Sequence, residues 1–390
     1  SAKSTPLTTS LIPMELCNSS DEDENTNEVN QSRTKNSSNK VPEVSGDQRG
    51  PIVPMISDEP AFSVELLRLY YDRLFPYDQM FRWLSYGNDP DKKHPGLVKD
   101  FFLRREWSFT IADDIYIRYQ SFRDASEMRN AMMKRQPHKI DIGAVFSCAP
   151  KDHNTVSPAS FKPVERELVF DIDLTDYDEV RTCCTGASIC GRCWSLMSMA
   201  IQVLEPALRD DFGFENILFV YSGRRGVHCW VCDPGARSLS NEARTAVVNY
   251  LSVATTDAKT AIKKATWPPH PSLARALRIL EPLFESHIVP EEGQGLFAEK
   301  ERWEVILDSL PVDAVAQRLK QRWTRNSDHT DASMKWRELS EEINRLGRSD
   351  SSSGGPTAQK KKKIVQAHEL ELWKMNLVFH HCYPRLYENV

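Results

Sequence analysis

Residues 167–173, Glu-Leu-Val-Phe-Asp-Ile-Asp, alternate in a way that predicts a β-strand with an acidic face. Successive side chains of a strand point to opposite faces, so Asp171 and Asp173 share one face with Val169. Their Cα atoms would lie about 6.6 Å apart, within reach of one or two divalent cations about 4 Å apart. This pair favours nucleotidyl transfer, in which one ion activates a hydroxyl and another neutralises a triphosphate. The alternative is an acidic strand end that runs into a solvated segment at 175–178.

A second motif is Tyr221-Ser-Gly-Arg-Arg-Gly-Val-His228, within residues 217–232, which are predicted to form two strands joined by a turn. Its glycines allow the backbone to approach a ligand closely, and Arg224 and Arg225 offer forked donors to phosphate oxygens. His228 adds a donor from the adjoining strand. Alone, the turn is also explained as a basic hairpin tip in solvent. Beside a strand with two carboxylates, it completes a metal–triphosphate site.

Four of the nine cysteines fall within eleven residues: Cys183, Cys184, Cys190 and Cys193. The odd total and the lack of a secretory signal favour a metal site over a disulfide framework. Thiolates this close suit a structural Zn²⁺ whose four tetrahedral positions are all filled. The alternative is buried free thiols, because adjacent cysteines are a rarer ligand pair than Cys-x-x-Cys. We interpret Cys229-x-x-Cys232 as no metal site, since residues three apart on a strand face opposite ways, one inward and the other outward.

Two further acidic residues, Glu106 and Asp141, stand on segments that are predicted to be extended and have apolar neighbours. Both are candidate site residues. The alternative for each is a surface or hydrogen-bonded polar residue.

The composition indicates a globular protein, since 40% of the 390 residues are hydrophobic and the formal charge is −5. This small net charge leaves nucleic-acid binding open, because a local basic groove can bind phosphates. No stretch approaches the roughly 18 consecutive apolar residues of a spanning helix, and the start of the chain lacks the apolar core of a signal peptide. We therefore expect no membrane partner.

The chain divides by composition and periodicity. Helices are predicted at 63–75 and from 194 to a stop at Gly213, and residues 139–147 are predicted as a further strand of the same sheet. The predicted fold class is α/β, a mixed-sheet core with a helical subdomain and a small zinc-binding module. The predicted divisions are a disordered tail at 1–60, the catalytic core at 61–235 with the zinc module at 183–193, a helical subdomain at 236–347, a basic low-complexity loop at 348–363, and a truncated return to the core at 364–390.

These motifs resemble the small catalytic subunit of the archaeal and eukaryotic-type DNA primase, over residues 62–390. The resemblance implies the primase catalytic fold and a DNA-directed RNA polymerase that makes short RNA primers on single-stranded DNA during replication. The matching stretches are Leu66–Pro76, Arg105–Thr110, Asp114–Phe122, Lys139–Val145, Glu167–Asp173, the cysteine cluster, Asp211–Phe214 and Tyr221–Asp233.

The resemblance also implies roles for the candidate residues. Asp171 and Asp173 would hold catalytic Mg²⁺ or Mn²⁺, with Glu106 also at the active site, Asp141 near the incoming ribose and a structural Zn²⁺ on the four cysteines. The residues that would bind the triphosphate are Ser222, Arg224, Arg225 and His228. The implied partners are a primase large subunit with an iron–sulfur cluster, the DNA polymerase alpha complex, a single-stranded DNA template and ribonucleoside triphosphates, in the nucleus.

The sequence departs from this family near residue 387. Family members carry a third metal-binding Asp in a segment that resembles Cys382–Val390, followed by a Lys- and His-bearing stretch, whereas this chain has Tyr387 and then ends. Glu388 would point to the opposite face of a strand. We therefore expect weaker primer synthesis than the fold implies. The alternative function is a catalytically impaired primase-fold scaffold that binds zinc and the large subunit without turnover.

Overall fold

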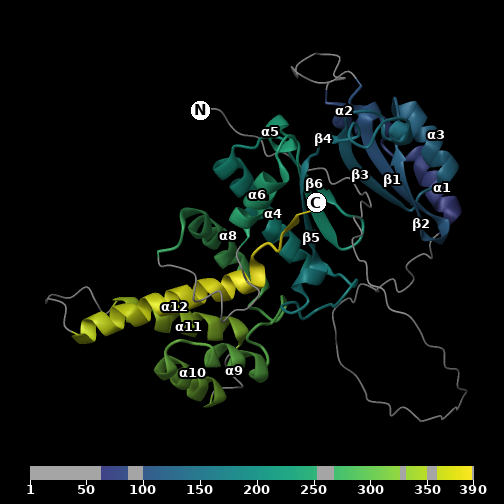
Figure 1. Ribbon diagram of the computed structural model, residues 1–390. Helices are drawn as coiled ribbons and strands as arrows, with labels where there is room; N and C mark the ends of the chain where they lie inside the picture. Colours follow the sequence, from purple (N-terminus) through teal and green to yellow (C-terminus); the bar gives the residue numbers. More distant parts are fainter. Residues whose placement is uncertain (1–62, 87–99, 253–267, 326–330, 349–357, 389–390) are drawn as a thin grey trace, which may run out of the picture.

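The computed structural model describes residues 63–86, 100–252, 268–325, 331–348 and 358–388. They form two four-stranded sheets and a large helical region. Figure 1 shows the first sheet with α1–α3 on one side of the molecule, the second sheet with α4 in the middle, and the remaining long helices beyond α4. The predicted tail at 1–60 lies outside the described residues.

The first sheet has the strand order β2-β1-β3-β4, and each neighbouring pair is antiparallel. Trp107 and Phe109 of β1 are fully buried in an apolar core that includes side chains of α1, α2 and α3. The predicted helix at 63–75 is confirmed, with Ser63 as its N-cap. The elements are α1 (Val64–Arg73), α2 (Tyr77–Ser85), β1 (Arg105–Ile111), β2 (Ile115–Gln120), α3 (Ala125–Arg135), β3 (Lys139–Phe146) and β4 (Pro163–Glu165), with 3-10 helices η1 (Phe102–Arg104), η2 (Ala112–Asp114) and η3 (Pro150–Thr155).

The second sheet has the order β6-β7-β5-β8 and is also antiparallel throughout. Its strand β5 buries Leu168, Phe170 and Ile172 against the long helix α4. That helix was predicted from its apolar stripe, and it runs without interruption to a left-handed Gly213. The elements are β5 (Leu168–Asp173), η4 (Leu174–Tyr177), α4 (Gly191–Phe212), β6 (Ile217–Tyr221), β7 (Gly226–Val231) and β8 (Tyr387–Glu388).

The prediction of one mixed sheet is wrong in two respects. Residues 139–146 belong to the first sheet and not to the sheet of β5. In addition, the sheet of β5 is antiparallel throughout and not mixed. β5 and β6, which α4 connects, run in the same direction, but β7 lies between them and is antiparallel to both. The reason is local: only four residues separate β6 from β7, so the two strands pair as a hairpin.

The helical region packs on α4 and extends further along the chain than predicted. Helix α12 begins at Ala358, so the end of the predicted loop at 348–363, with Lys360–Lys363, is helical, while residues 349–357 lie outside the described part. A lysine-rich segment is a good helix former when an apolar stripe follows it. Most of the predicted return to the core is likewise helix, and its described part meets the second sheet through β8, which pairs with β5. The elements are α5 (Pro234–Arg237), α6 (Asn241–Leu251), α8 (Pro271–His287), α9 (Lys300–Asp308), α10 (Asp313–Arg325), α11 (Ala332–Arg348) and α12 (Ala358–Cys382).

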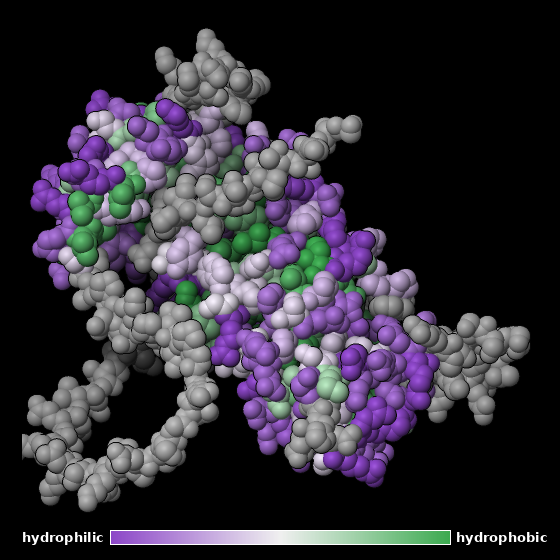
Figure 2. Space-filling view, turned by 180° about the vertical axis from the view of Figure 1, so that it is seen from behind, coloured by the Kyte–Doolittle hydropathy of each residue, from purple (hydrophilic) through white to green (hydrophobic). Residues whose placement is uncertain are grey.

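Two further properties concern membrane-spanning helices and exposed apolar side chains. Across the described ranges, no helix is long and apolar enough to span a bilayer. Figure 2 shows apolar side chains at the surface of the lobe that holds α1, where Leu66 and Leu74 are 57% and 70% exposed.

Candidate active site and metal centre

The two carboxylates of β5 lie on the face of the strand that is opposite α4. Asp171 is paired across the sheet with His228, and Asp173 with Gly226. His228 is buried, and its Nε2 lies 3.4 Å from Oδ1 of Asp171. The side chains of Asp171 and Asp173 are 31% and 28% exposed, so both remain accessible to a ligand. The structure therefore brings together the acidic strand and the strand that follows the arginine turn.

The turn between β6 and β7 has a shape that requires its glycines. Gly223 has a φ of +91°, in the left-handed region that a side chain disfavours. A Cβ on Gly226 would lie 2.3 Å from the carbonyl oxygen of Ile172, so only glycine lets β7 approach β5 here. Ser222 closes the turn, because its hydroxyl accepts from Gly226 N at 3.1 Å and its N–H donates to Gly226 O at 3.0 Å. Arg224 is exposed at the tip.

Arg225 is bound to one of the candidate metal ligands. Its Nε lies 2.8 Å and 2.6 Å from the two carboxylate oxygens of Asp173. The same carboxylate also accepts from the N–H and the hydroxyl of Thr175, at 2.8 Å and 2.9 Å. Asp173 is thus held in place by the turn that follows it, and a cation there would compete with Arg225 for the carboxylate.

A third carboxylate near this pair was missed at the sequence level. Burial, followed by the negative charges of Asp173 and Asp171, raises the pKa of Asp176 to about 6. Three acidic groups in one region favour a bound cation. The available signal was the position of Asp176 three residues after Asp173, which places it one 3-10 turn further along in η4.

Glu106 and Asp141 lie close together on the first sheet. Asp141 pairs with Ser108 across β1 and β3, two residues along the strand from Glu106. Glu106 is buried and ion-paired with Arg118 of β2, with 3.1 Å between Nε and Oε1. Arg118 is a second residue that sequence reasoning missed, because its partner lies twelve residues away on another strand. A Cβ at Gly143 would lie 3.1 Å from the Glu106 Cβ, so this position also favours glycine.

Asp141 has the properties of a carboxyl group that can accept a further hydrogen bond. Burial raises its pKa to about 6, although a hydrogen bond from Tyr116 opposes the shift. Its buried Oδ1 has no hydrogen-bond partner among the described residues. The hydrogen bonds and ion pairs of Glu106 and Asp141 stay within the first sheet. The two sheets touch through apolar side chains such as Trp107 and Val169.

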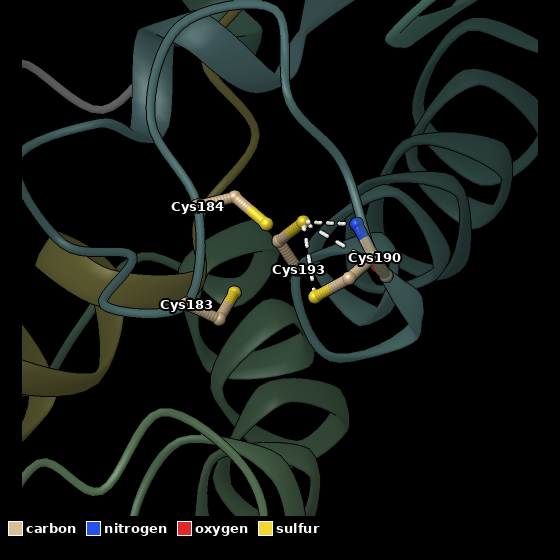
Figure 3. A group of neighbouring side chains, drawn as sticks. All are labelled: Cys183, Cys184, Cys190 and Cys193. Atoms are coloured by element: carbon tan, nitrogen blue, oxygen red, sulfur yellow. Dashed lines mark hydrogen bonds between the residues drawn. The ribbon is translucent and has the colours of Figure 1, made fainter. Parts of the chain in front are cut away.

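The four cysteines converge on one point (Figure 3), from the loop after η4 and from the first turn of α4. Their sulfur atoms all lie within 4.8 Å of one another, and those of Cys190 and Cys193 are 3.9 Å apart. Sulfurs in a tetrahedral Zn²⁺ site are separated by about 3.8 Å, as follows from Zn–S distances near 2.3 Å. The donor set therefore fits a thiolate-bound metal that has no open position.

Helix α4 begins inside this cluster. The Cys190 sulfur accepts from the N–H of Cys193, while the Cys193 sulfur accepts from the N–H of Cys190 at 3.1 Å. Burial raises the pKa of Cys190, but backbone N–H donors of Cys193 and Arg192 outweigh it and lower the pKa to about 6. The start of a helix thus stabilises a thiolate, which is the form that binds metal.

Among the described residues, Cys229 and Cys232 lie outside this cluster. They face opposite sides of the second sheet, but both are buried: Cys229 packs in the core under α4, and Cys232 in the core between the sheets. The expectation that one of them is exposed is wrong, because both faces of this sheet are covered.

The last strand approaches β5 from the side opposite β7. In β8, Tyr387 is paired with Asp171 and Glu388 with Phe170. Position 387 is therefore the register partner of one of the two candidate metal ligands.

The chain is similar to DNA primase small subunits. A family model described as "DNA primase small subunit" matches residues 170–390. The DNA primase small subunit of Drosophila melanogaster is 41% identical over 331 residues, which are 84% of this chain and 70% of the relative. That of Schizosaccharomyces pombe is 35% identical over 84% of this chain and 67% of the relative. The archaeal PriS of Thermococcus kodakarensis is 30% identical over 44% of this chain and 49% of its own length.

Proposed function

The chain belongs to the DNA primase small subunit family, whose role in DNA replication is primer synthesis, and from this premise we propose that Asp171 and Asp173 form the catalytic metal site. The observation that carries the proposal is the register of β5 with β7, which sets two carboxylates beside an arginine turn. One or two Mg²⁺ or Mn²⁺ ions held there would activate the attacking hydroxyl and neutralise the triphosphate. The reaction is nucleotidyl transfer from a ribonucleoside triphosphate.

In this proposal the turn binds the triphosphate. Arg225 neutralises Asp173 in the ligand-free chain. It donates to phosphate once the Asp173 carboxylate binds a metal ion. Arg224 extends from the tip, and His228 donates from below, where Asp171 holds its ring. The N–H and hydroxyl of Ser222 fix the turn's shape and leave its outward side to the phosphate. Arg225 thus exchanges its internal partner for phosphate oxygens.

Glu106 and Asp141 complete the proposed site from the first sheet. The unpaired Oδ1 of Asp141 is a suitable acceptor for a hydroxyl, which supports a place near the ribose of the incoming nucleotide. Glu106 is oriented by Arg118, and its charge would add to that of the β5 carboxylates. The four cysteines would hold a structural Zn²⁺, because four thiolates leave no position for a substrate.

The partners proposed for the chain follow from its family and from the motifs. The name "small subunit" implies a large subunit and a DNA template. We propose that the large subunit carries an iron–sulfur cluster and that the DNA polymerase alpha complex is a further partner. We also propose that the protein is located in the nucleus, where such a replication enzyme would act.

A catalytically impaired scaffold is the second candidate function. It is favoured by Tyr387, which is paired with Asp171 at a position where a third carboxylate would serve the metals. A phenol stays neutral near pH 7 and offsets little cation charge. Metal binding would then be weakened and not abolished.

Primer synthesis on an unprimed polypyrimidine DNA, with Mn²⁺ and labelled nucleotides, separates the two functions. The chain is assayed with and without a primase large subunit, and Tyr387→Asp is compared with Tyr250→Asp, an exposed site on α6. We expect weak synthesis by the chain and a rise of at least about tenfold in Tyr387→Asp. Synthesis that Tyr387→Asp leaves unchanged would show that the third carboxylate is dispensable. A complete lack of products from every variant would favour the scaffold.

A further inference from the structure

The four-cysteine cluster is surrounded by groups that are suited to its charge. Four thiolates around a divalent cation carry two excess negative charges, and such sites depend on nearby donors for affinity and geometry. Two side chains lie in position to serve in this way. Arg181 comes from the segment that leads into the cysteines, and Gln294 from the loop between α8 and α9.

Arg181 is a fully buried cation beside the cluster. Its side chain is 0% exposed, and Nη1 lies 4.0 Å from the Cys193 sulfur. The guanidinium is fixed on its other sides, since Nε donates to Asp178 at 2.6 Å and Nη1 to the Ser188 carbonyl at 3.0 Å. A third bond, from Nη2 to the Gly186 carbonyl at 2.6 Å, holds the loop that carries Cys184 and Cys190. Arg181 thus brings positive charge to the thiolates and shapes their loop.

Gln294 reaches the cluster from a distant part of the chain. The residue is 2% exposed, and its Nε2 donates to the Cys183 sulfur at 3.6 Å. Its Oε1 accepts from Thr182 N at 2.7 Å, and its backbone carbonyl accepts from the Thr182 hydroxyl at 2.7 Å. Both ends of the amide are therefore used, one on a ligand and the other on the residue before it.

The loop that presents Gln294 has little freedom. A Cβ on Gly293 would lie 2.0 Å from the His287 carbonyl oxygen, and Gly295 has a φ of +61°. Gln294 N donates to that same His287 carbonyl at 3.0 Å. Leu296 and Phe297, which follow, are buried in the core shared with α4. A shift of the cysteine ligands would therefore be transmitted to the packing of the helical region.

We propose that Arg181 and Gln294 are the positioning residues of the metal centre, and that metal binding fastens loop 290–297 to the cysteine segment. The ligand is Zn²⁺ or another thiophilic divalent cation, and this inference rests on the metal assignment proposed above. Through Gln294 the metal becomes part of the contact between the helical region and the second sheet, in addition to ordering the start of α4.

The first test measures metal retention in the 390-residue chain. Gln294→Glu keeps the acceptor for Thr182 but replaces the donor to Cys183 with a negative charge. Arg181→Lys keeps the positive charge but loses the forked N–H donors of the guanidinium. The matched controls are Gln202→Glu and Arg209→Lys, both exposed on α4. We expect each test variant to lose about 10- to 100-fold in Zn²⁺ affinity in chelator competition. The Co²⁺-loaded test variants should also show shifted thiolate absorption bands, and the controls should match the parent.

Equal affinity and equal Co²⁺ spectra in all variants would overturn the proposal while leaving the metal assignment intact. A parent chain that takes up neither Zn²⁺ nor Co²⁺ would overturn both.

A second test needs no variant. Amide hydrogen exchange is compared in the parent chain with Zn²⁺ and after chelation. We expect faster exchange on metal removal at the N–H groups of Gln294 and Leu296. These groups donate hydrogen bonds to the carbonyls of His287 and Ile288, respectively. Exchange that is unchanged in loop 290–297 but faster at the start of α4 would contradict the link to the helical region.

Discussion

At the scale of single residues, Asp171 is expected to be needed for metal binding and not for folding. Asp171→Ala removes a partly exposed carboxylate whose loss relieves repulsion with its neighbours, so the thermal midpoint should change little. Divalent-metal binding should be lost, because a ligand is gone. Mn²⁺ titration followed by electron paramagnetic resonance measures this, with Asp210→Ala as an exposed control. Early melting together with zinc loss would instead identify the carboxylate as structural.

Arg225 is expected to act in two opposite ways. Arg225→Ala should weaken nucleoside triphosphate binding by roughly 1.5–3 kcal/mol through the loss of a charge-assisted contact. In the absence of nucleotide, Mn²⁺ binding should become tighter, because Asp173 no longer has a competing guanidinium. Calorimetric titration of the nucleotide and of the metal gives both values, with Arg209→Ala as the control. Unchanged nucleotide affinity in both Arg224→Ala and Arg225→Ala would exclude the turn as the triphosphate site.

At the scale of elements, metal removal should loosen the first turn of α4. Without a cation the helix loses the contact that holds its start against the loop of Cys183 and Cys184. We expect one equivalent of zinc after gentle purification and faster hydrogen exchange at 191–195 after chelation. Less than about half an equivalent would argue against a closed four-thiolate site, which holds zinc tightly.

Local patterns predicted the strands and the turn of the site but not all the side chains that contact its residues. The alternation at 167–173 and the glycine–arginine turn predicted β5, the β6–β7 hairpin and the shared face of Asp171 and Asp173. Cysteine spacing predicted the cluster, because the four cysteines are close in sequence. Arg118 could not be predicted in this way, because a register shift between β1 and β2 sets which residue meets Glu106, and Gln294 meets Cys183 only through tertiary packing. The same limit explains why 139–147 was placed in the wrong sheet.

At the scale of the whole molecule, a buried ion pair joins β1 of the first sheet to the residue that precedes β5. Arg105 and Glu167 are 0% and 1% exposed, and 2.7 Å separates Nη2 from Oε1. Burial raises the pKa of Glu167, but the charge and hydrogen bonds of Arg105 outweigh it, and the pKa is lowered. A lowered pKa stabilises the fold above the pKa of the unfolded state, and this stabilisation is lost as the pH falls through the folded pKa.

Arg105→Met should therefore lower the free energy of unfolding by about 3–5 kcal/mol near neutral pH, because it leaves a buried carboxylate unpaired. The pKa of Glu167 should then rise, so the loss should be smaller near pH 4 than near pH 7. Urea unfolding at both pH values measures this. The double variant Arg105→Met with Glu167→Met should recover much of the stability, since it removes both charges. An equal loss at both pH values would mean that packing, and not charge, is what Arg105 supplies.

The position of β7 between β5 and β6 also sets the order in which the site can assemble. The hairpin closes over four residues and can form within about 1–10 μs, whereas β5 meets β7 only after the long excursion through the cysteine loop and α4. A partly folded chain would thus have its arginine turn formed before the carboxylates of β5 join it. Such a chain would attract polyphosphates and nucleic acid without being able to select a metal-bound nucleotide, and its specificity would arise only at the last, cooperative step of folding.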